Sequence, residues 1–331
     1  MPPVPGRGST RRRRPRVGLV LGAGGVLGAA WTAGALAALQ ERLPFGLDEA
    51  DLIVGTSAGS ILAAALRCGV SVADIVAHQR GSRQVALPHL DELDRESGPW
   101  PQLPRMRIGS ARLLASTALA PHRVHPWVAA SALVLQGRGQ LRSVRVLIDA
   151  LQFDPPGAWP GRGGTWIMAV DYEAGRRVAF GRPGAPVVPL ADAVVASCSI
   201  PGWYEPTLIA GRRYVDGGVR SSTSVDLLSK VDLDEVYVLA PMASFQMDNP
   251  RQPALRLERL FRRILTVGLA REVRKVEATG AKVTVLTPGP DDLAAIGVNM
   301  MDAARRQRVL ETSLLTSPLA LATGPDTELA A

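Results

Sequence analysis

The sequence predicts an α/β fold in which helices cover a mainly parallel central sheet. Residues 17–22 (VGLVLG) and 51–54 (DLIV) have the short apolar character of buried strands, and each is followed by a turn and a helical pattern. This strand–helix–strand–helix order is typical of parallel sheets covered by helices. Two further strands are predicted at 235–241 and 282–288, with a long helix at 255–279 between them.

The middle of the chain is expected to contain two antiparallel hairpins. Alternating runs at 165–172 and 176–181 flank a Glu-Ala-Gly turn and predict the first hairpin. Residues 207–210 and 213–215 predict the second one. A buried helix is expected between the hairpins, at 190–199.

One domain is predicted over residues 17–317, because no long linker divides the chain. It carries a helical insertion or cap at 97–145, where proline, tryptophan and arginine interrupt short apolar runs. This insertion is either an interfacial lid or a set of ordinarily packed surface helices. The last helix is expected at 301–315. Residues 1–16 are predicted to be a disordered basic tail, and residues 318–331 a flexible tail.

The long helix predicted at 255–279 is amphipathic. Its apolar side chains recur at helical spacing with arginines between them, so we expect the apolar stripe to face the core and the arginines to face solvent. The stripe comprises Leu257, Leu260, Phe261, Ile264 and Leu265, and the arginines are Arg259, Arg262 and Arg263.

Composition and charge restrict the function classes. The chain has 331 residues, 47% of them hydrophobic, and a formal net charge of +8, which favours anionic partners. Part of that charge lies in the basic tail, so the expected partner is an anionic membrane surface, which the tail would help to bind, and no nucleic acid is expected. Cys68 and Cys198 form no disulfide framework.

An uncharged run at 17–40 follows the arginines of the tail and has the length of a membrane span. We interpret it otherwise, because glycines divide it into a strand, a loop and a helix and no convincing signal-peptide cleavage site follows. The expected location is the cytoplasm, peripheral to the membrane.

The chemistry is expected at Ser57, the centre of the sequence GTSAG. In a G-x-S-x-G elbow the serine occupies a sharp strand-to-helix turn with its hydroxyl above the sheet edge, and Gly55 and Gly59 let strand and helix pass closely. The N-terminus of the next helix favours developing negative charge. Ser57 is therefore the predicted nucleophile; the alternative is a turn that only connects two elements.

A serine nucleophile needs a base, and an α/β-hydrolase would place a histidine late in the chain. Nothing after His125 can fill that role here, and His122 and His125 stay open as candidates. The predicted base is Asp216, which ends a hairpin strand and is held by the tight turn of Gly217 and Gly218. The alternative is that Asp-Gly-Gly only makes a good turn.

The third motif is the glycine loop, GAGGVLG, from Gly22 to Gly28, between the first strand and the first helix. Its amides can converge at a helix N-terminus and bind either a phosphate or an oxyanion. A dinucleotide-binding reductase is disfavoured, because no tyrosine is followed four residues later by lysine and no acid closes a second strand at the required spacing.

The glycine loop, GTSAG and DGG, in this order on a strand–helix scaffold, resemble the patatin-like phospholipase family over roughly 17–241. The resemblance implies a three-layer α/β/α fold and a Ser–Asp dyad without histidine, with Ser57 as nucleophile and Asp216 as base. It implies a carboxylic ester hydrolase that cleaves fatty-acyl esters of phospholipids or related lipids through an acyl-enzyme, with no metal or cofactor. The implied oxyanion donors are the amides of Gly24, Gly25 and Val26.

One position departs from the family pattern. Members commonly carry arginine or lysine just before the last glycine of the loop, and this chain has Leu27. The missing cation leaves open a catalytically weak lipid-binding or regulatory protein that keeps the fold. An acyltransferase that uses the same acyl-enzyme is a further alternative.

Overall fold

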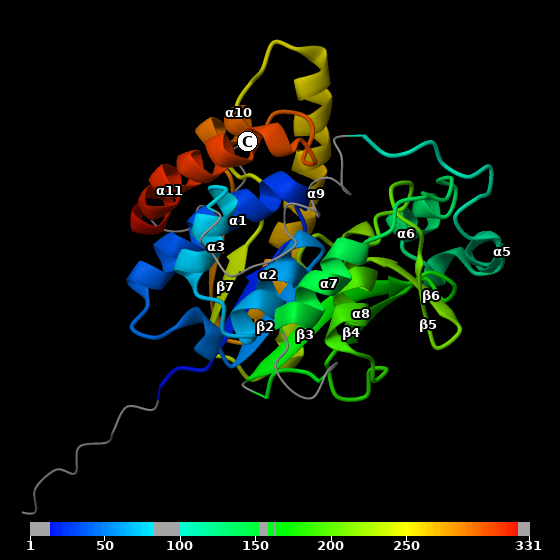
Figure 1. The fold of residues 1–331 in the computed structure, drawn as a ribbon, viewed down its shortest axis with the longest axis horizontal. Helices are drawn as coiled ribbons and strands as arrows, with labels where there is room; N and C mark the ends of the chain where they lie inside the picture. Colours follow the sequence, from blue (N-terminus) through cyan, green and yellow to red (C-terminus); the bar gives the residue numbers. More distant parts are fainter. Residues whose placement is uncertain (1–13, 83–99, 152–157, 162, 324–331) are drawn as a thin grey trace, which may run out of the picture.

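The structure is a computed structural model that describes residues 14–82, 100–151, 158–161 and 163–323. Within these residues an eight-stranded, mainly parallel sheet lies between layers of helices (Figure 1). The predicted three-layer fold is confirmed. Hydrogen-bonded neighbours follow the order β5-β6-β3-β2-β1-β7-β8, and β4 also pairs with β3. The strands are β1 (Val17–Leu21), β2 (Leu52–Thr56), β3 (Gly164–Asp171), β4 (Arg176–Phe180), β5 (Thr207–Ile209), β6 (Arg212–Asp216), β7 (Glu235–Leu239) and β8 (Lys282–Leu286).

Helices connect the strands and cover both faces of the sheet. The α-helices are α1 (Gly25–Arg42), α2 (Ala58–Arg67), α3 (Val72–Gln79), α5 (Ala111–Leu119), α6 (Pro126–Ser131), α7 (Arg142–Leu151), α8 (Leu190–Cys198), α9 (Pro253–Glu277), α10 (Pro290–Ile296) and α11 (Arg306–Thr323). The short 3-10 helices are η1 (Leu47–Glu49), η2 (Pro121–Arg123), η3 (Gly217–Val219), η4 (Val225–Lys230) and η5 (Ala303–Arg305).

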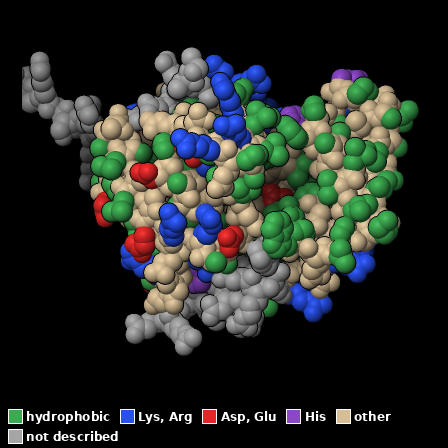
Figure 2. Space-filling view, turned by 90° about the horizontal axis from the view of Figure 1, so that it is seen from above, with side chains coloured by type: hydrophobic (Ala, Val, Ile, Leu, Met, Phe, Trp, Pro, Cys, Tyr) green, Lys and Arg blue, Asp and Glu red, His purple; other side chains and the backbone are tan. Residues whose placement is uncertain are grey.

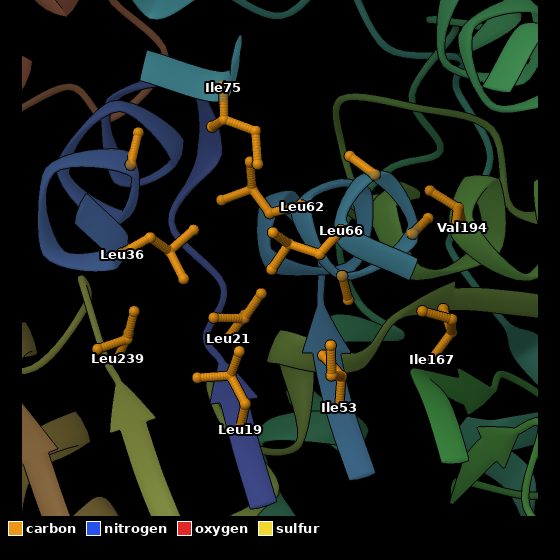
Figure 3. Packing of buried hydrophobic residues seen from close by; sticks show 14 of the residues in the cluster. Leu19, Leu21, Leu36, Ile53, Leu62, Leu66, Ile75, Ile167, Val194 and Leu239 are labelled. Carbon is orange, nitrogen blue, oxygen red and sulfur yellow. The ribbon is translucent and has the colours of Figure 1, made fainter. Parts of the chain in front are cut away.

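The core lies on both faces of the sheet because successive residues of a strand point to opposite sides. In β1, Leu19 and Leu21 pack in the layer that contains α1 and α2, where Figure 3 shows them near Leu36 and Leu62. Val20, between them, belongs to the opposite layer, which η4 and the C-terminal half of α9 cover. Both faces of the central strands are therefore buried.

The predicted insertion at 97–145, described here from residue 100, contains α5, η2, α6 and the start of α7. A separate apolar cluster anchors it, in which Leu113 and Val128 pack against Tyr172 and Val215 near the ends of β3 and β6. The Tyr172 hydroxyl also donates a hydrogen bond to the Ser131 carbonyl at 2.7 Å. The insertion thus packs beside the carboxyl end of β3 (Figure 1).

The prediction for the long helix is wrong in its N-terminal half. There, α9 buries Arg259 and Arg262, and the apolar stripe is turned outward. In the C-terminal half, for which no stripe residue was predicted, the buried residues pack on the sheet. The outward side chains are Leu257, Leu260, Phe261 and Ile264.

Described residues make contacts beyond both predicted ends of the domain, residues 17 and 317, and the boundaries themselves stay a prediction. Residues 1–13 lie outside the described residues, whereas Arg14, near the end of the predicted tail, pairs with Glu49 at 3.0 Å. The last helix begins later than predicted, because Asp302 accepts a bond from the Ala304 amide and starts η5 instead. It then continues to Thr323, beyond residue 317.

The uncharged run at 17–40 forms β1, the glycine loop and most of α1. In the described ranges no helix is both long enough and apolar enough to cross a membrane. Both cysteines are free thiols, with Cys198 buried and Cys68 partly buried.

Candidate active site

Ser57 lies on a sharp turn between β2 and α2. Its backbone has φ 52° and ψ −127°, in the left-handed range that a residue with a side chain rarely adopts. Such strain persists only where the surrounding structure imposes it, and it is concentrated at functional sites. The glycine at 55 is needed for this packing, since a Cβ there would lie 2.6 Å from the Ser60 Cα. A Cβ on Gly59 would collide with the Leu21 carbonyl.

The register of β3 places Asp216 beside Ser57. β4 occupies one edge of β3, so β2 and β6 share the other edge. β2 runs parallel to β3 and ends at Thr56, opposite Met168; β6 runs antiparallel and ends at Asp216, opposite Ala169. The two strands therefore approach end to end, and the residue that follows Thr56 meets Asp216.

The Asp216 carboxyl group is buried, with a residue exposure of 4%. The Gly218 amide donates to its Oδ1 at 2.7 Å, and the Ser57 side chain lies beside it. Burial raises the pKa of Asp216 to about 7, and the interactions with Ser57 and Gly218 act against this rise. Within the described residues no cation pairs with this carboxyl group. A hydroxyl thus faces a carboxyl group that can accept its proton near neutral pH.

Helix α8 holds both sides of this corner. The Ser57 amide donates to the Ser197 hydroxyl at 2.9 Å, and that hydroxyl donates to the Met168 carbonyl at 2.6 Å. The Asp216 amide donates to the Ser199 carbonyl at 3.0 Å. Neither serine was predicted from the sequence, because their partners are distant in sequence and only the folded chain brings them together.

The glycine loop leaves three amides without a backbone acceptor. The amides of Gly22 and Ala23 donate to carbonyls of Leu239 and Ser222, and that of Leu27 to the Met300 carbonyl. In the described part of the chain, no backbone carbonyl accepts a hydrogen bond from the three amides that lie between Ala23 and Leu27. These amides are at the start of α1, and the first amides of a helix lack acceptors within the helix. These amides, the predicted oxyanion donors, can hold an anionic oxygen. They belong to Gly24, Gly25 and Val26.

Close packing explains the loop glycines. At Gly24, an added Cβ would lie 2.7 Å from the Gly28 Cα and 2.8 Å from the Pro241 side chain. Gly25 has φ +57°, and a Cβ there would lie 2.7 Å from the Met301 sulfur. Larger residues would therefore displace the loop. A Cβ on Gly217 would likewise meet the Met168 carbonyl at 2.5 Å, so the turn after Asp216 is packed just as closely.

Ser57 and the glycine loop line one small pocket of about 70 Å³. Its remaining walls come from α1, α2, the start of α7, the end of α8 and the segment before η5. They are almost wholly apolar and accept a hydrocarbon chain better than a polar group. The lining residues besides Ser57 are Gly25, Val26, Ala29, Ala58, Ile61, Leu141, Val144, Cys198, Ile200, Tyr204 and Met301.

The two histidines that stayed open as bases do not line this pocket. His122 is exposed on η2. His125 caps α6, and burial together with Arg220 and Arg177 lowers its pKa. His78 does not line the pocket either, and His89 lies outside the described residues.

Leu27 is fully buried in the core. Behind the loop, however, Arg262 of α9 donates to the Pro241 carbonyl at 2.6 Å, and Pro241 packs against Gly24 and Gly28. A cation therefore supports the loop from outside it. Arg262 was predicted to lie on a solvent face, and this contact was not predicted.

Among the described residues no cluster of histidine, cysteine or carboxylate side chains could hold a metal ion. The site consists of a hydroxyl, a carboxyl group, a row of amides and an apolar pocket. Such a set can transfer an acyl group by general base and oxyanion chemistry.

The sequence model of a family described as patatin-like phospholipase matches residues 19–229. None of the curated proteins matches the chain in sequence. Among solved structures, VipD from Legionella pneumophila is 13% identical, with a TM-score of 0.48 and an alignment that covers 94% of this chain and 67% of VipD.

Two further solved structures are similar. In ExoU from the ExoU–SpcU complex of Pseudomonas aeruginosa, identity is 20%, the TM-score 0.36 and coverage 92% of this chain and 52% of ExoU. Human GIVD cytosolic phospholipase A2 is 15% identical, with a TM-score of 0.35 and an alignment that covers 93% of this chain and 58% of the phospholipase. The chain thus spans between about half and two thirds of the length of these proteins.

Proposed function

Because this chain belongs to the patatin-like phospholipase family, we propose that it is a lipid acyl hydrolase with Ser57 as nucleophile and Asp216 as base. Family membership supports the reaction class. The assignment of the two residues rests on one observation: the Ser57 side chain lies beside a buried carboxyl group whose pKa is raised to about 7. A base that titrates near the working pH is suited to this task.

In the first half of the reaction, the Ser57 oxygen bonds to the ester carbonyl carbon and its proton moves to the Asp216 carboxylate. The carbonyl oxygen becomes an oxyanion, which the free amides at the start of α1 stabilise, each by about 3–4 kcal/mol. The bond between this carbon and the alcohol oxygen then breaks. The departing alcohol takes the proton from Asp216 and leaves an acyl-enzyme.

In the second half, water attacks the acyl-enzyme and gives a proton to Asp216. The bond to Ser57 breaks, the proton returns to the serine oxygen and the fatty acid is released. Asp216 ends each half-reaction ionised, so one carboxylate serves both steps without a histidine.

The pocket supports a fatty-acyl ester as substrate. Ile61, Val144 and Ile200 line its walls next to Ser57, so the acyl chain would lie against apolar side chains. The polar part of the lipid would remain at the mouth. We therefore propose phospholipids or related acyl lipids as the substrate class.

The test is covalent labelling of the purified full-length chain with a fluorophosphonate, followed by peptide sequencing of the modified residue. We expect the label on Ser57, and we expect Ser57→Ala to lose both labelling and hydrolysis of a chromogenic acyl ester. Ser229→Ala, on η4, is the matched control and should behave as wild type.

Hydrolysis by Ser57→Ala at the wild-type rate, with both variants folded by circular dichroism, would overturn the assignment. A label on another residue would do the same. Product analysis with an added alcohol separates the two acyl-transfer outcomes, since ester formation in place of free fatty acid identifies an acyltransferase. Vesicle binding without any turnover would identify the catalytically weak lipid-binding alternative.

A further inference from the structure

The N-terminal half of α9 has its apolar side outward. Four side chains at helical spacing form what we call the α9 stripe, and large parts of each are exposed. Their exposed fractions are 69% for Leu257, 58% for Leu260, 43% for Phe261 and 44% for Ile264. Exposing a continuous apolar helix face to water is unfavourable, so such a face marks an interaction surface.

The inner side of the same helix half explains why it cannot turn around. Arg259 pairs with Asp248 and Glu258, and one of its nitrogens donates to the Leu293 carbonyl at 3.1 Å. Arg262 pairs with Glu258 at 2.7 Å and donates to the Pro241 carbonyl. Rotating the helix to bury its leucines would break these bonds, so the stripe remains outside.

The stripe lies next to the candidate active site. Figure 1 shows the first turns of α9 at the top of the molecule, beyond the carboxyl ends of the strands. Arg262 lies between two stripe residues and behind them. It contacts Pro241, which packs on Gly24 of the glycine loop.

On the other side of the stripe, Phe261 contacts Trp127 of α6 edge to face, with ring centroids 6.3 Å apart. Helix α6 in turn packs against η3, the turn that follows Asp216.

The space-filling view agrees with this placement. Figure 2 shows the molecule from above, with hydrophobic side chains gathered around a hollow and both basic and acidic side chains near them. Trp127 is 45% exposed, so the apolar surface continues from α9 onto the insertion.

The exposed charged side chains of this helix half are positive. Arg251, Arg256 and Arg263 are exposed in this helix half or just before it. The nearby Glu258 is engaged with buried arginines, and the exposed acid of α9, Glu277, lies at its far end. An apolar stripe flanked by arginines fits an anionic lipid surface, where the side chains enter the acyl region and the arginines meet head groups.

We propose that the α9 stripe docks this protein onto a bilayer that contains anionic lipid. Docking there would present the mouth of the pocket to the lipid. The delivery of substrate to the pocket rests on the proposed function, whereas the docking does not. Two surfaces of the helix thus have separate tasks: the outer one binds lipid, and the inner one holds the glycine loop.

The test is sedimentation with vesicles of mixed phosphatidylglycerol and phosphatidylcholine, with the full-length chain carrying Ser57→Ala so that no lipid is consumed. Leu257→Gln with Leu260→Gln should lower vesicle affinity by about a hundredfold, because burying each leucine is worth roughly tenfold. Arg256→Gln with Arg263→Gln should lower it by about tenfold, and only on vesicles with the anionic lipid. Val187→Gln with Leu208→Gln, two exposed apolar residues elsewhere, is the control and should bind as the parent does.

A readout that needs no bilayer separates this proposal from the proposed function. With Ser57 restored, the stripe variant should hydrolyse a soluble chromogenic ester at the wild-type rate and lose turnover on vesicles. Unchanged vesicle affinity of the stripe variant would overturn the proposal. So would equal binding to vesicles with and without anionic lipid. A wild-type dimer that becomes a monomer in the stripe variant, with no vesicle binding, would assign the stripe to a second copy of the chain and also overturn it.

Discussion

Two buried regions of this chain hold charged side chains, and they treat charge differently. Where β2 and β6 meet, Asp216 accepts a hydrogen bond from an amide and lies beside the Ser57 hydroxyl, and no cation pairs with it among the described residues. On the inner face of α9, Arg259 and Arg262 are as deeply buried, but they pair with Glu258 and Asp248. The first region keeps its buried carboxyl group without a cation, and the second pairs its buried arginines with carboxylates.

The difference separates chemistry from support. A buried carboxyl group without a cation has a raised pKa and readily takes a proton, at a cost in stability. A buried arginine with carboxylate partners holds its neighbours in one geometry, and removing one partner leaves the other charge exposed to an apolar environment. The first arrangement suits a base, and the second suits a scaffold for the glycine loop.

The largest expected effect comes from removing the unpaired charge. Asp216→Asn keeps the shape and the bond from Gly218 but cannot accept the serine proton, so kcat/KM should fall by roughly 10²- to 10⁴-fold. The free energy of unfolding at pH 8 should rise by a few kcal/mol in order of magnitude, because a buried charge is gone. Steady-state kinetics on a chromogenic ester and urea unfolding measure the two changes.

Asp149→Asn, an exposed carboxylate on α7, is the control and should change neither quantity. A variant at Asp216 that loses stability instead of gaining it would contradict the contrast between the two regions. Full activity in Asp216→Asn would contradict its role as base.

Breaking the paired region should give the next largest effect. Arg262→Met leaves Glu258 without one of its cations and frees the Pro241 carbonyl, so the free energy of unfolding should fall by about 3–5 kcal/mol. Urea unfolding at neutral pH measures it.

The partner supplies the control for this prediction. Glu258→Gln combined with Arg262→Met removes both charges of the pair and should cost less than Arg262→Met alone. If the double variant is the less stable one, the pair does not hold the helix in the way proposed.

The sequence predicted the sheet, the elbow and the hairpins because these depend on local patterns. Buried strands are short apolar runs, and the turn at Ser57 needs glycines at fixed offsets. The resemblance to the patatin-like family is confirmed by the match over residues 19–229. The order of the motifs was enough to nominate Asp216, although its contact with Ser57 depends on the register of β3.

The inverted half of α9 could not be predicted in this way. Helical periodicity shows that two stripes exist, and it does not show which one faces the protein once the helix extends beyond the sheet. The choice depends on Asp248 and on carbonyls of Pro241 and Leu293, which meet the arginines only in the folded chain. Ser197 was missed for the same reason, since it lies in another helix than Ser57.

The smallest expected effect is a pH dependence that belongs to the unpaired region alone. The pKa of Asp216 is raised from 3.8 to about 7, so its base form is gained as pH rises to about 7, and kcat/KM should fall about tenfold for each pH unit below that value. For stability the sign is opposite: the folded chain holds this proton more tightly than the unfolded chain. The resulting contribution to stability is complete below pH 3.8 and is lost as pH rises through about 7.

Activity is therefore gained over the window in which stability is lost. Initial rates and the midpoints of urea unfolding between pH 5 and 9 measure activity and stability. Glu258→Gln is the control. Its pH dependence of the rate should match that of the wild type, because the arginines that contact Glu258 stay charged throughout this range. In Asp216→Asn the free energy of unfolding should change less with pH than in the wild type. A stability slope that persists in that variant would assign the titration to another group and remove the link between the unpaired charge and the chemistry.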